Sequence, residues 1–354
     1  MRMNGPDSVT FDPFDTKAIA RRLVLFMAEQ GLEDVSIGEL RRFTVGFSWA
    51  TFGFHASWRE RGAKVERDLI LRVGPPTGIF APYLASPEFI TLAALAGTGV
   101  PVPGVYWYSD TDAVLGAPFF VCDLVPGDVP IPWTHDGGPA FDDATRLDLG
   151  AQFLQALAAL HQFEWQGTEV ATIGGCTDPA RTALDQVGNW ERRLAHWSPK
   201  RVPILEWAAI WLRENAPVAP RISIVHGDFR IGNFLVADGR ITSILDWELV
   251  GLGDPVEDLG WICLQAWRGR SPHMCHFFTR EELRDRYAEL TGIEPAMKAI
   301  RYWEAFGTYK LAVMHYAASY SFETLGFNDL RMAGMGAQIP RMLLQVESAM
   351  ERAA

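Results

Sequence analysis

Residues 222–248 read ISIVHGDFRIGNFLVADGRITSILDWE, and this stretch brings polar side chains to the ends of two apolar runs. The first run leads into Asp228, the second leads into Asp246, and Asn233 lies between them. Two carboxylates and an amide at strand ends can converge on one point. Hard oxygen ligands suit Mg²⁺, which binds through one or two carboxylates together with substrate phosphates. The stretch therefore predicts a magnesium site.

The composition predicts a protein with a sizeable hydrophobic core. The 354 residues are 48% hydrophobic and include 13 Trp and 21 Phe, so one large or two ordinary domains are expected. A formal net charge of −11 argues against nucleic acid as a partner, because phosphate binding relies on Lys and Arg surfaces. The four widely spaced cysteines suggest reduced thiols, and no apolar run approaches the ~18 residues of a membrane helix. We therefore expect a cytoplasmic protein without a signal peptide or membrane segment, either a monomer or a homodimer.

Strand signals dominate the chain up to residue 125. A helix begins after Asp15, and a second follows Ser86-Pro87. Polar residues 59–67 predict a turn. Strands are expected over 40–45, 52–58, 68–73, 102–108 and 118–124. This pattern predicts a small antiparallel lobe over residues 1–125.

Helical patterns dominate the remainder. Residues 125–143 contain four Pro and three Gly and predict a linker or lid between the two halves. Helices are expected over 144–162, 189–197, 203–215, 261–267, 279–291, 294–320 and 337–353. The fold class is α+β, with a mostly helical second domain over residues 126–354.

Phosphoryl transfer needs the nucleotide held, the γ-phosphate charge neutralised and the acceptor hydroxyl aligned. Asp228 can accept the proton of the acceptor. Asn233 and Asp246 can hold Mg²⁺ between the phosphates. Arg230, two residues after Asp228, can reach the transferred phosphoryl group.

The strand-rich lobe supplies candidates for nucleotide binding. Arg72, inside the apolar strand Leu-Ile-Leu-Arg-Val, can bind the α- and β-phosphates and can be braced by Glu88. The loop that begins at Gly46 can fold over the phosphates with its backbone N–H groups and the Ser48 hydroxyl. Glu88 is equally well explained by the helix dipole, and Ser48 by an ordinary turn.

These motifs resemble the aminoglycoside phosphotransferase and choline kinase group, which shares the protein-kinase-like fold. HGDFRIGN at 226–233 is similar to the group's catalytic loop, and ILDWE at 244–248 stands where kinases carry D-F-G. GDPVEDLGW at 253–261 is a further element of the group, in which Asp258 is structural. LRVGPP and WEAFGTYKLAVMHY resemble the branch that is fused to acyl-CoA dehydrogenases.

The resemblance implies a bilobal kinase fold that uses ATP and Mg²⁺, with a nucleotide-binding lobe over residues 1–125 and a catalytic, substrate-binding lobe over residues 126–354. It also implies that backbone at Cys122 and Leu124 contacts adenine. We therefore expect a small-molecule kinase that phosphorylates an alcohol, either a hydroxyacyl-CoA or a similar apolar alcohol. An acyl-CoA would need basic residues at the pocket mouth, with candidates Arg192, Arg193, Lys200 and Arg201. The alternatives are an aminoglycoside or macrolide phosphotransferase, and a non-catalytic nucleotide-binding module, which the glycine-poor loop after Gly46 would favour.

Overall fold

The computed structural model describes residues 12, 15–43, 46, 48–134, 140–326 and 329–353. The chain forms two compact units. The first comprises Met1–Ala93 with Pro103–Val125, and the second comprises Ala94–Val102 with Pro126–Ala354. Antiparallel strands dominate the first unit and helices the second, so the predicted α+β class is confirmed.

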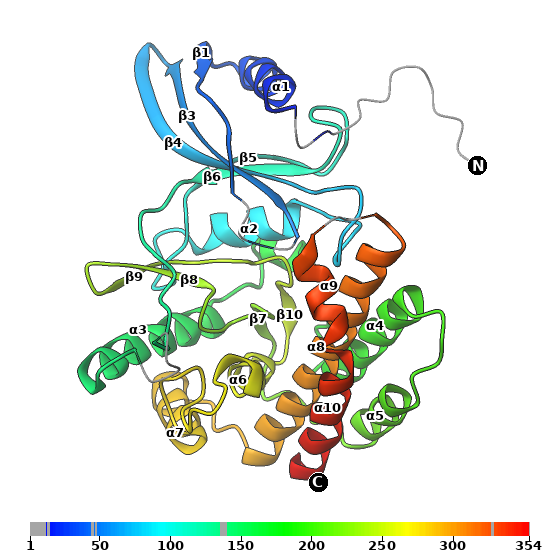
Figure 1. The fold of residues 1–354 in the computed structure, drawn as a ribbon. Helices are drawn as coiled ribbons and strands as arrows, with labels where there is room; N and C mark the ends of the chain where they lie inside the picture. Colours follow the sequence, from blue (N-terminus) through cyan, green and yellow to red (C-terminus); the bar gives the residue numbers. More distant parts are fainter. Residues whose placement is uncertain are drawn as a thin grey trace. The chain divides into compact units, whose positions relative to one another are not determined.

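A six-stranded antiparallel sheet forms the centre of the first unit (Figure 1). Its order is β1-β3-β4-β6-β5, and β2 also pairs with β3. Its strands are β1 (Glu33–Ile37), β2 (Arg41–Phe43), β3 (Ala50–Glu60), β4 (Ala63–Val73), β5 (Val105–Ser109) and β6 (Phe119–Asp123). Helix α1 (Thr16–Glu29) begins where the Asp15 side chain accepts the N–H of Ala18, as predicted. Its apolar side packs on the sheet through Ile19, Leu23 and Met27. Helix α2 (Ser86–Leu95) also begins where it was predicted.

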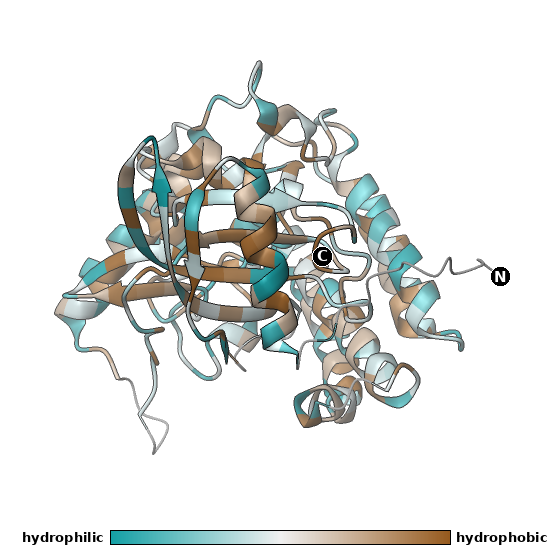
Figure 2. Cartoon of the chain, turned by 90° about the horizontal axis from the view of Figure 1, so that it is seen from above, coloured by the Kyte–Doolittle hydropathy of each residue, from teal (hydrophilic) through white to brown (hydrophobic). Residues whose placement is uncertain are grey.

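Two strand predictions were wrong. Residues 59–67 are not a turn, because β3 and β4 continue to a two-residue loop at Arg61-Gly62, where both residues have positive φ. Such a loop matches the twist of the two strands and extends their pairing. The end of the hairpin is exposed, so polar residues there do not interrupt the strands. The hydrophobic residues of the sheet lie along its middle (Figure 2). The prediction also omitted β1, whose burial pattern lacks a fully buried position.

The second unit is mostly helical, and no described helix in it or in the first unit is long and apolar enough to span a membrane. Its α-helices are α3 (Asp143–Gln162), α4 (Thr182–Trp197), α5 (Pro203–Glu214), α6 (Val256–Ile262), α7 (Arg280–Thr291), α8 (Met297–Glu323), α9 (Leu330–Ala337) and α10 (Ile339–Ala353). Two 3-10 turns, Glu169–Thr172 and Gln265–Trp267, complete the set. Helix α8 lies beside α9 and α10, and most of its residues are buried (Figure 1).

Several helix boundaries differ from the prediction. Helix α4 starts seven residues earlier than predicted. The prediction missed this start because no side chain caps the helix at Arg181, so the sequence carries no start signal there. The predicted 261–267 helix is α6 followed by a 3-10 turn. The predicted last helix, 337–353, is confirmed as α10, whereas α9, which precedes it and ends at Ala337, was not predicted.

Two small sheets hold the 222–248 stretch. Strand β7 (Ser223–Val225) pairs with β10 (Gly251–Gly253), and β8 (Phe234–Ala237) pairs with β9 (Arg240–Ile244). The β8–β9 hairpin turns at Asp238-Gly239, where both residues have positive φ, the conformation that an Asp-Gly pair favours. The two apolar runs of the sequence therefore form strands of separate sheets and are not paired with each other.

Candidate active site

The turn after β7 positions Asp228. Gly227 has a φ of +80°, and a Cβ atom there would lie 2.7 Å from the carbonyl oxygen of Leu249. The turn therefore needs glycine for both its conformation and its space. The backbone N–H groups of His226 and Gly227 donate to the buried carboxylate of Asp258, at 2.8 and 2.9 Å. Because Asp258 belongs to α6, this helix holds the turn that leads into Asp228.

Asp228 accepts hydrogen bonds on both carboxylate oxygens. Oδ1 accepts from Arg230 Nε at 3.0 Å and from Trp261 Nε1 at 2.7 Å. Oδ2 accepts from Asn233 Nδ2 at 2.6 Å. The guanidinium of Arg230 also lies over the ring of Trp267, with 4.4 Å from Cζ to the ring centroid. The structure thus brings three predicted site residues, Asp228, Arg230 and Asn233, into direct contact.

His226 links Asp228 to the strand that leads into Asp246. Its Nδ1 accepts the N–H of Asp228 at 3.1 Å, so Nε2 carries the proton and donates to the carbonyl of Leu245 at 3.0 Å. Burial lowers the pKa of His226 and keeps the ring neutral. The N–H of Leu245 donates to the carbonyl of Asn233 at 2.8 Å. Asp246, with a φ of +60°, follows Leu245 directly, so its backbone lies close to Asn233.

The carboxylate of Asp258 is fully buried and has a third partner. His161 donates to it from Nε2 at 3.1 Å, and the other ring nitrogen of His161 contacts the Tyr287 hydroxyl at 2.8 Å. Burial by itself would raise the pKa of Asp258, but the interactions with His161 and His226, including the hydrogen bonds from the His161 ring and the His226 backbone N–H, together outweigh it, and the pKa lies below its usual value. Asp258 is therefore an ionised anchor for the turn.

A buried lysine lies behind the same turn. Lys310 on α8 is 2% exposed, and its Nζ donates to the carbonyl of Gly227 at 2.7 Å and to Glu257 Oε1 at 3.3 Å. The ammonium also lies over the rings of Trp261 and Trp190, at 4.6 and 5.6 Å from the centroids. Burial raises the pKa of Glu257 to about 7, although the charge of Lys310 opposes that rise.

The predicted nucleotide residues lie in the first unit. Arg72 Nη1 donates to Glu88 Oε2 at 3.0 Å, and the Glu88 side chain is almost completely buried, so the predicted bracing contact is confirmed. The Arg72 guanidinium lies 5.7 Å from the ring centroids of both Trp49 and Phe120. Trp49 belongs to the loop that begins at Gly46, so this loop and Arg72 are neighbours.

Four further predicted residues lie in the same unit. Gly46 has a φ of +113°, and Ser48 is buried, whereas Phe47 between them is outside the described residues. Cys122 is buried in β6, and burial raises the pKa of its thiol to about 12. The N–H of Leu124 donates to the carbonyl of Asp68 at 3.0 Å, so this donor already has a partner within the sheet.

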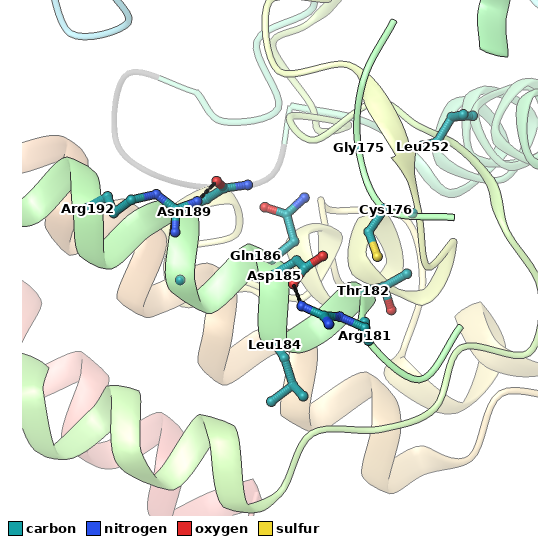
Figure 3. Close-up of a pocket in the computed structure, with 12 residues that line it drawn as sticks. Gly175, Cys176, Arg181, Thr182, Leu184, Asp185, Gln186, Asn189, Arg192 and Leu252 are labelled. Carbon is teal, nitrogen blue, oxygen red and sulfur yellow. Dashed lines mark hydrogen bonds and ion pairs between the residues drawn. The ribbon is translucent and has the colours of Figure 1, made fainter. Parts of the chain in front are cut away.

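A pocket of about 530 Å³ opens beside helix α4 (Figure 3). One wall is α4 with Arg181 at its start, and the other includes Cys176 and β10. Arg181 Nη2 donates to Asp185 Oδ1 at 3.2 Å, and Arg192 contacts the side-chain oxygen of Asn189. Asp228, Asn233 and Asp246 do not line this pocket. Its connection to them is β10, which pairs with β7, the strand that leads into Asp228.

Sequence reasoning missed three residues around this site. Trp261 and Lys310 lie in helices whose apolar pattern resembles ordinary core, although a lone lysine within the apolar run of α8 was an available signal. Arg181 precedes α4, whose start the sequence does not mark.

Residues 52–303 match the model of a phosphotransferase enzyme family. Acyl-CoA dehydrogenase family member 10 of Mus musculus is 30% identical over 203 residues, covering 56% of this chain and 18% of that protein. Acyl-CoA dehydrogenase family member 11 of Homo sapiens is 25% identical over 345 residues, covering 94% of this chain and 42% of that protein. The chain thus spans less than half the length of these two relatives.

Two solved structures share the fold. A Ralstonia eutropha protein assigned as an aminoglycoside phosphotransferase superposes with a TM-score of 0.71 at 21% identity, covering 94% of this chain and 98% of that one. A thermostable aminoglycoside phosphotransferase in a ternary complex with ADP and hygromycin B gives a TM-score of 0.55 at 15% identity, with coverage of 94% and 98%. At these identities the likeness concerns the fold alone.

Proposed function

Because this chain belongs to the phosphotransferase enzyme family, as its motifs predicted, we propose that it transfers the γ-phosphate of ATP to a hydroxyl group of a small molecule with the help of Mg²⁺. The observation that carries this proposal is that Asn233 bonds both to the Asp228 carboxylate and to the backbone of Leu245, the residue before Asp246. Phosphoryl transfer relies on positioning and electrostatic stabilisation, and this arrangement offers both a base and cation ligands.

Asp228 is the proposed base. Among the described residues, its Oδ2 accepts a hydrogen bond from the Asn233 amide alone, whereas Oδ1 accepts from two donors. An acceptor hydroxyl at hydrogen-bond distance from this carboxylate would donate its proton to Asp228 as the oxygen attacks phosphorus. Arg230, now paired with Asp228, is the proposed cation for the transferred phosphoryl group.

Asn233 and Asp246 are the proposed Mg²⁺ ligands. The Asn233 amide nitrogen points to Asp228, which directs its carbonyl oxygen, the atom that binds cations, to a different side. Among the described residues, no group of three His, Cys, Asp or Glu side chains could hold a metal ion. The two oxygen ligands from Asn233 and Asp246 fit Mg²⁺, because this ion keeps water and phosphate oxygens in the rest of its coordination shell. When bound, the ion would neutralise charge on the phosphates.

The first unit is the proposed nucleotide-binding lobe and the second the catalytic lobe. Arg72 would bind the α- and β-phosphates with its orientation held by Glu88, and Gly46 and Ser48 would contribute hydrogen-bond donors. For adenine, backbone near Cys122 remains the proposed contact. The Leu124 N–H would have to exchange its bond with Asp68 to take part.

We further propose an acceptor that combines a hydroxylated apolar part with an anionic group, as a hydroxyacyl-CoA does. The α4 pocket supports this, because Arg181 and Arg192 both line it and only Asp185 among its lining residues is acidic. Of the other basic candidates, Arg193 lies over Trp190 and Arg201 pairs with Glu206. The similarity to acyl-CoA dehydrogenase family members 10 and 11 favours the same acceptor class.

The test of the acceptor pairs two variants. Arg192→Ala should raise the KM for a hydroxyacyl-CoA at least about tenfold, the effect of losing 1.4 kcal/mol of binding. It should leave the KM for the corresponding uncharged pantetheine thioester unchanged. Arg201→Ala is the matched control, because this arginine does not line the pocket. Equal effects of the two variants would contradict the assignment.

Aminoglycoside or macrolide phosphorylation is the second candidate, favoured by the fold of the solved neighbours, which include a macrolide 2′-phosphotransferase from Brachybacterium faecium. A cationic antibiotic would be expected to meet carboxylates, and Arg181 and Arg192 on the pocket wall argue against it. A non-catalytic nucleotide-binding module is the third candidate.

One experiment separates the three candidates. Purified protein is incubated with ATP, Mg²⁺ and a library of hydroxyacyl-CoAs, aminoglycosides, macrolides and choline, and products are detected by mass spectrometry. We expect a product 80 Da heavier, the mass of a phosphoryl group, from a hydroxyacyl-CoA. Asp228→Asn should lower turnover about 10²- to 10⁴-fold with ATP affinity retained, and Asp246→Ala should weaken Mg·ATP binding. Asp238→Asn, in the exposed β8–β9 turn, is the matched control. ATP binding without any product would favour the non-catalytic module.

A further inference from the structure

The Asp228 carboxylate has one hydrogen-bond donor with no other proposed task. Arg230 is the proposed cation for the transferred phosphoryl group, and Asn233 is the proposed metal ligand. Trp261 is 2% exposed, and its indole N–H donates to Asp228 Oδ1 at 2.7 Å. An indole nitrogen is a donor only, so it can hold the carboxylate but can neither take its proton nor bind the cation.

Lys310 contacts both the same turn and Trp261. Its buried ammonium donates to the carbonyl of Gly227, the residue before Asp228, at 2.7 Å. It also lies 4.6 Å from the ring centroid of Trp261. A buried ammonium is costly unless its donors are satisfied, and here the partners are the turn itself, Glu257 and aromatic faces. Lys310 therefore contacts both the backbone that leads into Asp228 and the ring that orients its side chain.

We propose that Trp261 and Lys310 are positioning residues for Asp228, with Trp261 fixing the orientation of the carboxylate and Lys310 fixing both Trp261 and the Gly227 peptide. The proposal rests on the assignment of Asp228 as the base. It follows that Oδ1 stays bound to Trp261 when Arg230 turns to the phosphoryl group. The Oδ2 atom is then the one that faces the acceptor hydroxyl.

The variants are chosen to separate positioning from stability. Trp261→Phe removes the indole N–H and keeps a buried aromatic ring. Trp303→Phe is the matched control, because Trp303 is also buried and also donates from Nε1 to a carboxylate, that of Asp254, at 2.9 Å. Lys310→Met removes the charge and keeps an unbranched side chain of similar length.

The kinetic measurement uses the acceptor found in the product screen. We expect Trp261→Phe and Lys310→Met to lower kcat about 10- to 100-fold, the size seen when a partner that orients a functional group is lost. The KM values for ATP and acceptor should stay within twofold, and Trp303→Phe should keep the wild-type kcat. A kcat loss shared equally by Trp303→Phe, or a rise in KM without a fall in kcat, would overturn the proposal.

Hydrogen–deuterium exchange tests the positioning without turnover. Peptides that cover residues 226–233 should exchange at least tenfold faster in Trp261→Phe and Lys310→Met than in the wild type and Trp303→Phe. Unchanged exchange in both variants would overturn the positioning role, whether or not the protein phosphorylates anything. If the wild type yields no product while exchange changes as expected, the proposed function fails and the positioning of the turn stands.

Discussion

Replacing Asp258 with Asn tests how the turn before Asp228 is held. The carboxylate accepts hydrogen bonds from the N–H groups of His226 and Gly227 and from His161 Nε2, at 2.8, 2.9 and 3.1 Å. An amide presents one oxygen in place of two and sets an NH₂ group against a donor. At least one buried N–H then loses its acceptor, and His161 loses its anionic partner. We expect Asp258→Asn to lower the free energy of unfolding by about 3 to 5 kcal/mol, the range for removing one member of a buried charged pair.

The assay is urea unfolding at pH 7 and at lower pH, with Asp254→Asn as the matched control. Asp254 is also buried and accepts hydrogen bonds from Val256 and Trp303. Burial raises its pKa from 3.8 to about 6, so folding already disfavours its charge. We expect Asp254→Asn to cost about 1 kcal/mol at pH 7, the net value of a typical hydrogen bond.

The difference in unfolding free energy between wild type and variant should change with pH in opposite directions for Asp258→Asn and Asp254→Asn. The pKa of Asp258 is lowered on folding, so its stabilisation is complete above the unfolded value of 3.8 and is lost as the pH falls below it. The stability difference between wild type and Asp258→Asn should therefore shrink on acidification. The pKa of Asp254 is raised on folding, so its ionisation destabilises the wild type as the pH rises from 3.8 to about 6. A cost below 1 kcal/mol for Asp258→Asn at pH 7, or equal costs for the two variants, would refute the reasoning.

Three further predictions concern the buried ion pair, a raised pKa and the glycine turn. Arg72→Met should lower the free energy of unfolding by about 3 to 5 kcal/mol in urea titrations, because it removes the cation beside buried Glu88. The double variant Arg72→Met/Glu88→Leu should recover most of the lost stability, and no recovery would contradict a pairwise effect. Folding raises the pKa of Glu257 from 4.5 to about 7, so stability should fall as the pH rises across that interval, and Glu257→Gln should flatten this dependence in thermal unfolding scans. Gly227→Ala should lower the free energy of unfolding, measured by calorimetry, by about 1 to 3 kcal/mol, because Gly227 has a φ of +80° and a Cβ atom there would lie 2.7 Å from the Leu249 carbonyl oxygen. A neutral result would show that the turn rearranges.

Local sequence signals predicted much of the first unit and the framework of the site. The Asp15 cap and the Ser86-Pro87 helix start each depend on a few neighbouring residues, and each is present in the structure. Sequence signals failed where context decides. The β3–β4 hairpin extends through polar residues because its end is exposed, and α4 begins without a capping side chain.

The amino-acid sequence by itself identified the phosphotransferase family, because motifs such as HGDFRIGN at 226–233 and ILDWE at 244–248 consist of neighbouring residues and do not depend on how the chain packs. Only the tertiary structure decided what surrounds those motifs. Trp261 and Lys310 come from helices that are distant in sequence, and they reach the turn before Asp228 because packing of α6 and α8 brings them there. Contacts of that kind depend on how helices pack against each other, which no local pattern of residues specifies.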